Sequence, residues 1–311
     1  MEQEQKKRLV TRSDFDGLAC AMMLRALDLI DEIKFVHPKD VQDGKVELFP
    51  TDITTNLPYD PRVGLAFDHH ESEMDRLKAQ ETGGKLIIDP NARSAARVVY
   101  DYYGGKDVFP RVSEELMAAV DKGDSADFTI DEILNPKGWV LLHYLMDPRT
   151  GLGRFRQFRI SNYDLMMQLI GFCMDHTIDE ILELPDVKER VDLYFQQADL
   201  FKEQLHRIAK IYDKVVVLDL REEEIIHAGN RFMIYALYPE SQISVHVAWG
   251  FRKQNTAVMI GKSIVNKAST VDIGELCLKY GGGGHHNAGT CQLENDVVDA
   301  ELPNIIAALN A

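Results

Sequence analysis

The first 90 residues alternate short apolar runs with a helical segment, and this alternation constrains the fold more than any other feature. The runs are rich in β-formers and cover residues 9–10, 33–36, 46–49, 63–67 and 86–88. Between the first two runs, apolar residues from Ala19 to Ile30 recur at helical spacing. Strand, helix and strand in this order predict βαβ units and a parallel sheet. We therefore expect an N-terminal α/β domain.

A long apolar stripe over residues 187–208 marks a boundary between two parts of the chain. Its members recur three or four positions apart: Val187, Val191, Tyr194, Ala198, Phe201, Leu205 and Ile208. This spacing is typical of an amphipathic helix of about seven turns, and it follows a mostly helical stretch over residues 94–183. We expect a first domain over residues 1–185, a connecting helix over 186–212 and a second domain over 213–311.

The second domain begins with β signals. Runs rich in β-formers cover residues 215–220, 232–237, 243–251 and 257–260, and the third run alternates strictly between apolar and polar residues. A helical segment follows over residues 271–279. Sequential β runs before a helix predict a smaller α+β domain with a mixed or antiparallel sheet. The length of 311 residues agrees with two domains.

Composition excludes several classes of function. The chain is 45% hydrophobic and 27% charged, which is typical of a soluble globular protein. Its net charge of −15 should repel nucleic acid, so we expect no duplex DNA partner. An anionic substrate would need a local positive source, such as metal ions or a few placed bases. The four cysteines have no CxxC spacing, so no thiolate zinc site is predicted.

The N-terminus and the length of the apolar runs indicate where in the cell the protein is expected. The charged N-terminus is not followed by an apolar stretch of signal-peptide length, and no apolar run approaches a membrane span of roughly 18 residues. We expect a cytoplasmic protein without a membrane partner. A homodimer is left open.

Polar residues stand at the ends of three apolar runs in the first domain. Asp14 and Asp16 follow the first run, Asp52 follows the run at 46–49, and Asp68-His69-His70 follows the run at 63–67. Because parallel strands present their carboxyl ends at one edge, separate strand-end groups can converge there. Converging carboxylates stay ionised only with a counter-charge, and a divalent cation with oxygen and imidazole ligands is the usual solution.

Each of these fragments also has a simpler explanation. Asp14-Phe15-Asp16-Gly17 is typical of a turn followed by a helix N-terminus. Asp52 alone says little, because an exposed aspartate after a strand is common. Asp68-His69-His70 is the most informative fragment, because polar groups directly after a buried strand are costly without a polar task. The metal-site hypothesis depends on the fragments acting together.

A glycine-rich segment stands near the other end of the chain. The sequence Gly281-Gly-Gly-Gly-His285-His286-Asn287-Ala288-Gly289 can bring backbone N–H groups close to an anion, and His285 can donate to a phosphate oxygen. The alternative is a flexible linker. The run leads from a helical segment into an apparent strand at residues 290–293, which favours a ligand-binding loop.

These motifs in this order resemble the DHH phosphoesterase family with its C-terminal DHHA1 domain. The residues that carry the resemblance are Ser13-Asp-Phe-Asp-Gly17, Asp52, Asp68-His-His70 and Gly282-Gly-Gly-His285-x-x-Ala288. The resemblance spans essentially the whole chain. It implies a manganese- or magnesium-dependent phosphohydrolase, with residues 1–185 as the catalytic DHH-type domain and residues 213–311 as a substrate-binding DHHA1-type domain.

The resemblance also implies roles for individual residues. Asp14 would bind one metal and Asp16 the other, Asp52 would bridge both, and His69 would bind the second. Asp68 would hold the His69 imidazole, and His70 would assist the transferring phosphoryl group. A fourth acidic ligand is expected after the middle helices, where Asp121 fits best and Asp124 is the alternative. Substrate would be bound by Gly282, Gly283, Gly284 and His285.

The sequence departs from the family pattern at one place. Many members carry a histidine shortly before the first aspartate, whereas this chain has Val10-Thr11-Arg12-Ser13. The first metal would then be left with Asp14 and Asp52. Arg12 is therefore a candidate for contacting phosphate, and the number of metals stays open.

The resulting hypothesis is hydrolysis of phosphoester bonds in a short single-stranded oligonucleotide or a small phosphorylated nucleotide by metal-activated water. Two alternatives are kept. One is an exopolyphosphatase or pyrophosphatase, which uses the same chemistry. The other is a nucleotide-binding regulatory protein without turnover, which the missing histidine motivates.

Overall fold

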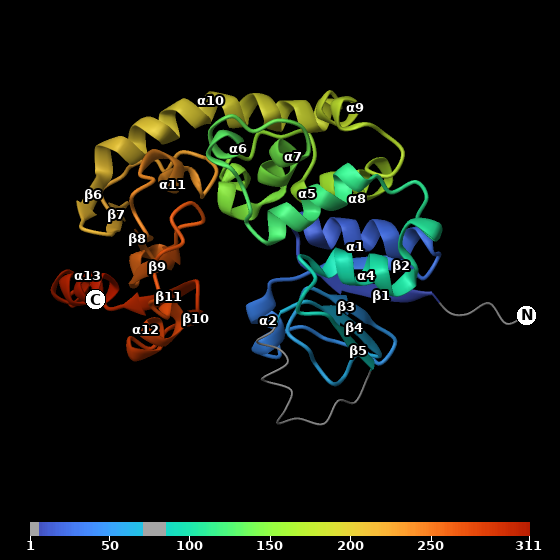
Figure 1. Ribbon diagram of the computed structural model, residues 1–311, viewed down its shortest axis with the longest axis horizontal. Helices are drawn as coiled ribbons and strands as arrows, with labels where there is room; N and C mark the ends of the chain where they lie inside the picture. The colour runs from blue at the N-terminus through green and yellow to red at the C-terminus, as the bar shows by residue number, and fades with distance from the viewer. Residues whose placement is uncertain (1–5, 71–84) are drawn as a thin grey trace, which may run out of the picture. The chain divides into compact units, whose positions relative to one another are not determined.

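The computed structural model describes residues 6–70 and 85–311, which divide into two compact units (Figure 1). The first unit comprises Met1–Asp127, Lys137–Pro148 and Leu152–Asp192, and the second comprises Phe128–Pro136, Arg149–Gly151 and Leu193–Ala311. The long helix α10 (Pro185–Ile208) starts in the first unit and ends in the second. Its first turns are held by the buried Arg190, which donates to the backbone oxygens of Asp186 and Ile160.

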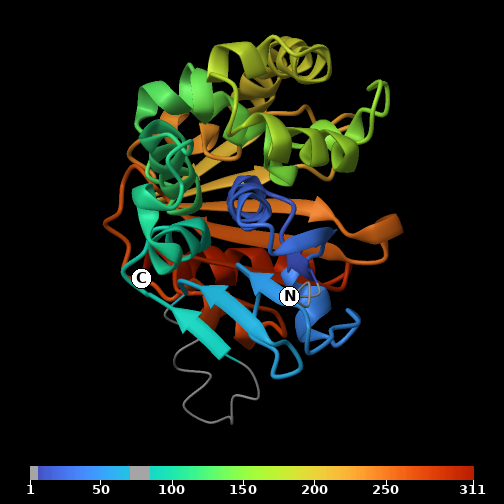
Figure 2. The ribbon, with the colours of Figure 1, turned by 90° about the vertical axis from the view of Figure 1, so that its right-hand side faces the viewer.

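The first unit is built on a parallel sheet, which confirms the predicted α/β class. Its strands are β1 (Lys7–Thr11), β2 (Ile30–Phe35), β3 (Ile53–Thr55), β4 (Leu65–Asp68) and β5 (Lys85–Ile88). They lie in the order β2-β1-β3-β4-β5, and all neighbours are parallel. Figure 2 shows the blue-to-cyan arrows of β3, β4 and β5 side by side and pointing the same way.

One predicted strand of this sheet is wrong. The apolar run at residues 46–49 is not a strand, and the third strand is instead Ile53–Thr55. Val46 and Leu48 are buried because they pack in a small cluster with Leu57, Tyr59 and other apolar residues, not because they pair in the sheet. Asp52 therefore precedes a strand and does not follow one.

Helices surround this sheet. The α1 helix (Phe15–Ala26) is buried over most of its surface and contacts α4, α5 and α8. Short polar side chains accept hydrogen bonds at several helix N-termini, as Asp14 does for α1 and Ser94 for α4. The other described helices of this unit are α2 (Pro38–Gln42), α4 (Ala95–Tyr103), α5 (Glu114–Asp124), α7 (Gly138–Met146), α8 (Asn162–Phe172) and α9 (Ile178–Leu182).

The second unit contains a mixed sheet, as predicted. Its strands are β6 (Ala209–Tyr212), β7 (Val215–Asp219), β8 (Ile243–Trp249), β9 (Thr256–Lys262), β10 (Gly283–His285) and β11 (Ala288–Leu293), in the order β10-β11-β9-β8-β7-β6. Only β7 and β8 pair in parallel. Its other helices are α6 (Ile130–Leu134), α11 (Met233–Leu237), α12 (Ile273–Lys279) and α13 (Val298–Asn310).

The predicted strand at residues 232–237 is wrong, because the structure places α11 there. A short apolar run has no periodicity that separates a buried strand from a buried helix. Among the described residues, no helix is long and apolar enough to cross a membrane.

Candidate active site

The candidate site lies at the carboxyl ends of β1, β3 and β4. Arg12, Asp14 and Asp16 follow β1, Asn56 follows β3, and Asp68-His69-His70 ends β4. Neighbouring strands place these residues at one edge because the sheet is parallel. The ends of β1 and β3 are tied together by side chains, since the Thr55 hydroxyl donates to Thr11 Oγ1 over 2.7 Å.

Asp14 combines a structural and an electrostatic role. Its Oδ1 accepts a hydrogen bond from the Gly17 backbone N–H at 3.0 Å, which caps α1, and its Oδ2 lies 3.0 Å from Arg12 Nε. A Cβ at Gly17 would lie 2.1 Å from the Arg12 carbonyl oxygen, so only glycine fits this turn. The helix-start explanation of this motif is therefore confirmed, and a role of Asp14 in a metal site stays a prediction.

Asp16 is held in the interior and is 3% exposed. Its Oδ1 accepts from the Ala96 N–H at 2.7 Å, and its Oδ2 accepts from Asn56 Nδ2 at 2.6 Å and from the Ala95 N–H at 3.2 Å. Burial, and then the negative charges of Asp124 and Asp14, raise the pKa of Asp16 well above its ordinary range. A cation beside this carboxyl would favour its ionised form.

His69 faces a carboxylate from another part of the chain. Its Nε2 lies 2.7 Å from Oδ2 of Asp124, the last residue of α5, and its Nδ1 lies 3.3 Å from the Ala92 carbonyl oxygen. Burial opposes charge on this ring, but the pairing with Asp124 outweighs it and raises the pKa of His69 to about 9. Burial also opposes charge on Asp124, yet pairing with His69 lowers the pKa of that carboxyl.

The donor set fits a hard divalent cation. Asp16 and Asp124 offer carboxylate oxygens and His69 offers an imidazole nitrogen, which are ligand types that Mn²⁺ accepts. Asn56 adds a further acceptor: its Oδ1 is buried and has no hydrogen-bond partner among residues 6–70 and 85–311. The amide orientation follows from its Nδ2, which donates to Asp16. A buried acceptor without a donor is costly unless a cation satisfies it.

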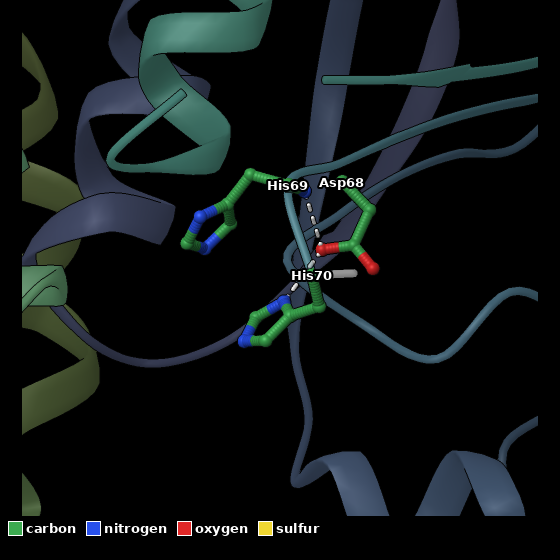
Figure 3. Close-up of side chains that lie close together, drawn as sticks. All are labelled: Asp68, His69 and His70. Atoms are coloured by element: carbon green, nitrogen blue, oxygen red, sulfur yellow. Dashed lines mark hydrogen bonds and ion pairs between the residues drawn. The ribbon is translucent and has the colours of Figure 1, made fainter. Parts of the chain in front are cut away.

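Asp68 holds His70 in place (Figure 3). Its Oδ1 lies 2.8 Å from His70 Nδ1 and accepts from the His69 backbone N–H, also at 2.8 Å. Figure 3 shows the His69 ring turned away from this carboxylate. Asp68, His69 and His70 bring one ligand atom each within 4.8 Å of one another. The implied contact between Asp68 and the His69 ring is therefore corrected, because the acid orients the other imidazole.

The structure does not bring Asp52 to this site. Asp52 is 1% exposed and precedes β3, at the amino edge of the sheet, where Arg8 Nε and Nη2 lie 3.1 and 2.7 Å from its two oxygens. The Phe49 N–H donates to the same carboxylate at 2.8 Å. Its ligand sites are filled by these donors, so the expectation that Asp52 bridges two metals is corrected.

Asp121 is also engaged elsewhere. Its Oδ2 accepts from Arg97 Nη2 at 2.6 Å and Nε at 3.0 Å, and its Oδ1 accepts from the Ser94 hydroxyl at 2.7 Å. This arrangement ties α5 to the start of α4. The alternative considered from the sequence, Asp124, is the acid that faces His69, so the first choice of Asp121 is corrected.

Sequence reasoning missed Asn56. The strand expected at residues 46–49 puts the strand end near Asp52, whereas the strand in the structure ends at Thr55. The available signal was the β-branched triplet Ile53-Thr54-Thr55, which ends at Asn56. Asn56 also has a positive φ of 53°, a conformation that asparagine tolerates better than most residues.

The glycine segment forms part of a hairpin in the second unit. Gly283–His285 is strand β10, which pairs with β11. A Cβ at Gly282 would lie 2.2 Å from the Thr290 carbonyl oxygen, and one at Gly284 would lie 2.3 Å from that of Ala288, so close packing demands both glycines. Nothing lies within 4 Å of a Cβ position at Gly283. The same is true at Gly281, so packing does not demand glycine at either of these two positions.

Comparisons with known proteins were made for the whole chain. No protein-family model matches it, and no curated protein matches it. A solved structure of the pGpG-specific phosphodiesterase PggH from Vibrio cholerae is 57% identical, with a TM-score of 0.84, and the match covers 98% of this chain and 99% of that one.

Two structures of RecJ from Thermus thermophilus, one in complex with Mn²⁺ and one with Mg²⁺, are each 16% identical. Their TM-scores are 0.58 and 0.51, and the matches cover 98% of this chain but 52% and 50% of those chains. At this identity the likeness concerns the fold alone.

Proposed function

The chain belongs to the DHH phosphoesterase family, and from this premise we propose that it is a divalent-metal-dependent phosphodiesterase that acts on short linear oligonucleotides. The substrate class follows from its similarity to PggH, which is a pGpG-specific phosphodiesterase. A 5′-phosphorylated dinucleotide has one phosphodiester bond, so hydrolysis would consume one water and release two mononucleotides. The net charge of −15 agrees with a short substrate, because a long duplex would need a basic track.

The observation that carries this proposal is the convergence of Asp16, His69 and Asp124 at the carboxyl edge. We assign these three residues, together with Asn56 Oδ1, as the groups that hold Mn²⁺ or Mg²⁺. When bound, such a cation supplies positive charge at the phosphate and a water of lowered pKa. The contact of His69 Nδ1 with the Ala92 carbonyl favours a proton on Nδ1, which leaves Nε2 as the ligand atom.

The remaining groups of the site orient and protonate the substrate. Asp68 accepts from His70 Nδ1, so His70 Nε2 is the atom that can deliver a proton to the departing 3′ oxygen. His70 is half-exposed, which lets a substrate reach it. In the second unit, we assign Gly282, Gly283, Gly284 and His285 to substrate binding.

A substrate panel tests this proposal and its alternatives. Purified protein with added Mn²⁺ would be offered pGpG, longer oligoribonucleotides, pyrophosphate and polyphosphate, with EDTA as the control. We expect mononucleotide release from the dinucleotide and its loss in EDTA. Preferential cleavage of pyrophosphate or polyphosphate would favour the phosphoanhydride alternative. Binding of the dinucleotide without cleavage, while Mn²⁺ is bound, would favour the regulatory alternative.

A further inference from the structure

A cavity of about 420 Å³ lies in the first unit, beside the carboxyl end of α1. Its walls come from the last turns of α1, from residues 108–111 before α5, and from residues 170–175 at the end of α8. Asp16 and Arg25 lie nine residues apart on α1, which separates them by about 14 Å along the helix axis. The cavity is therefore separate from the candidate active site, and its volume suits one small organic molecule.

The inner wall of this cavity is apolar. Met22, Phe109 and Ile170 line it, and none of them is more than 3% exposed. The Phe109 ring is held by the Tyr100 ring, which stacks on it with 5.7 Å between the ring centres. Thioether and aromatic side chains pack well on a planar ring. The part of a ligand that enters this cavity should therefore be aromatic.

Gly171 leaves one wall of the cavity without a side chain. It lies in the last turn of α8, its φ is not positive, and a Cβ there would meet nothing within 4 Å. Neither the backbone conformation nor the packing requires glycine here, although glycine is a weaker helix former than alanine. A larger side chain at this position would fill the cavity and leave the helix intact.

Arg25 brings a positive charge to the cavity. Among residues 6–70 and 85–311, its guanidinium has no hydrogen bond or ion pair, while the other base of the lining, Arg111, pairs with Asp175. The lining thus keeps one uncompensated positive charge in a chain whose net charge is −15. A base in the last turn of a helix also complements the helix dipole, but this role leaves the guanidinium donors available to an anion.

We propose that this cavity binds a small aromatic anion, whose ring packs against Met22, Phe109 and Ile170 and whose anionic group pairs with the Arg25 guanidinium. A guanidinium donates two parallel hydrogen bonds to a carboxylate or a phosphate. An aromatic carboxylate and a mononucleotide share this chemistry. The site does not depend on the proposed function, because it shares no residue with the carboxyl edge of the sheet.

Calorimetric titration of the full chain tests the proposal with three probes. These are 1-naphthoate, GMP and the neutral 1-naphthalenemethanol. We expect saturable binding of one equivalent of an anion, and the tighter of the two anions identifies the source of the ligand. The neutral probe should bind about tenfold more weakly than naphthoate, because it lacks the charge-assisted hydrogen bonds. Failure of both anions to bind would overturn the proposal.

Two variants locate the bound anion. Arg25→Met removes the charge and keeps an apolar stem, and Gly171→Leu fills the cavity. We expect each to weaken binding of the anion by about tenfold or more, whereas Arg25→Met should leave the affinity for the neutral probe unchanged. Arg62→Met is the matched control, because Arg62 lines a different cavity and pairs with Asp60. It should leave every affinity unchanged.

Two results would contradict this assignment. One is anion binding that survives both Arg25→Met and Gly171→Leu. The other is binding that is lost only in Arg62→Met, which would place the anion in the other cavity. Thermal midpoints check that the variants are folded. If Gly171→Leu does not fold, a crystal soaked in 1-naphthoate decides, since the naphthoate density must lie beside Arg25 and density elsewhere would overturn the proposal.

Discussion

The two ends of strand β1 carry the same pair of residue types with opposite outcomes. At the amino edge, Arg8 binds the buried Asp52 through both of its oxygens, and the guanidinium lies 4.8 Å from the centre of the Phe49 ring. At the carboxyl edge, Arg12 Nε lies 3.0 Å from Asp14 Oδ2, with Asp16, Asp124 and Asp147 close by. At the amino edge, Arg8 neutralises the charge of Asp52. At the carboxyl edge, the aspartates carry more negative charge than Arg12 can neutralise.

This difference separates a structural ion pair from a candidate catalytic site. A buried aspartate is not informative by its residue type, since Asp52 and Asp16 are both almost fully buried. The useful observation is whether neighbouring donors and cations satisfy the carboxylate. At the amino edge they do, and at the carboxyl edge we propose that a further cation does so.

The largest expected effect separates two aspartates of one helix. Asp124→Asn should reduce kcat by roughly 10⁴-fold, because it removes a charged metal ligand and metal ions contribute several kcal/mol to the barrier. Asp121→Asn, three residues earlier on α5, should reduce stability through its contacts with Arg97 and leave kcat nearly unchanged. Steady-state kinetics and thermal melts of both proteins check this pair.

If Asp121→Asn abolished activity in a folded protein while Asp124→Asn did not, the assignment of the acidic ligand would be reversed.

The next largest effect is expected on stability, at the amino edge of the sheet. Asp52→Asn should lower the free energy of unfolding by about 3 kcal/mol, because it removes the charge of a buried carboxylate that pairs with the partly buried Arg8. The metal-dependent rate of the folded fraction should stay near that of the wild type. Urea titration measures the stability, and kinetics well below the melting temperature measures the rate. Loss of metal binding in this variant would place Asp52 in the site after all.

A smaller catalytic effect is expected at His70. His70→Gln should lower kcat by about 10²-fold, since it removes the proton donor to the leaving oxygen. Asp68→Asn should produce a partial loss, because His70 keeps its ring but loses the acceptor of its Nδ1 proton. A substrate with a good leaving group, such as a nitrophenyl ester of a nucleotide, should recover much of the rate. Equal losses on both substrates would contradict the proton-donor role.

The smallest effect is expected at His246, where burial is the cause of the pKa shift. His69 pairs with Asp124, whereas burial alone lowers the pKa of His246 on β8 to about 4. The unfolded chain titrates this imidazole near its ordinary value of about 6.5. The stability that depends on a neutral His246 is therefore fully present above pH 6.5 and is lost as the pH falls toward 4.

We expect this contribution to be on the order of 1 kcal/mol, because the residue as a whole is only half-buried. His246→Gln should flatten the stability profile between pH 4 and 6.5 in chemical denaturation. An unchanged slope would show that His246 is not the group responsible.

Much of the carboxyl edge could be predicted from the sequence. Asp14, Asp16 and His69 stand in short motifs next to strands, so local sequence fixes their position in the fold. Asp52 failed because an apolar loop run at 46–49 was interpreted as a strand, which shifted the expected strand end by several residues. Asn56 was missed for the same reason.

Other features depend on contacts that no local pattern contains. Asp121 and Asp124 lie on one helix three residues apart, and only the tertiary partners, Arg97 for one and His69 for the other, separate them. The glycine segment was expected to be a ligand loop, yet packing of β10 against neighbouring backbone requires Gly282 and Gly284 whatever they bind. The run at 232–237 forms α11 because tertiary packing decides short apolar segments.

Anomalous scattering from crystals soaked in Mn²⁺ would test most directly whether a cation completes the carboxyl edge. We expect a strong peak within bonding distance of Asp16, His69 Nε2 and Asp124, and no peak near Asp52. A peak bound to Asp52, or an edge that stays without metal at saturating Mn²⁺, would contradict it.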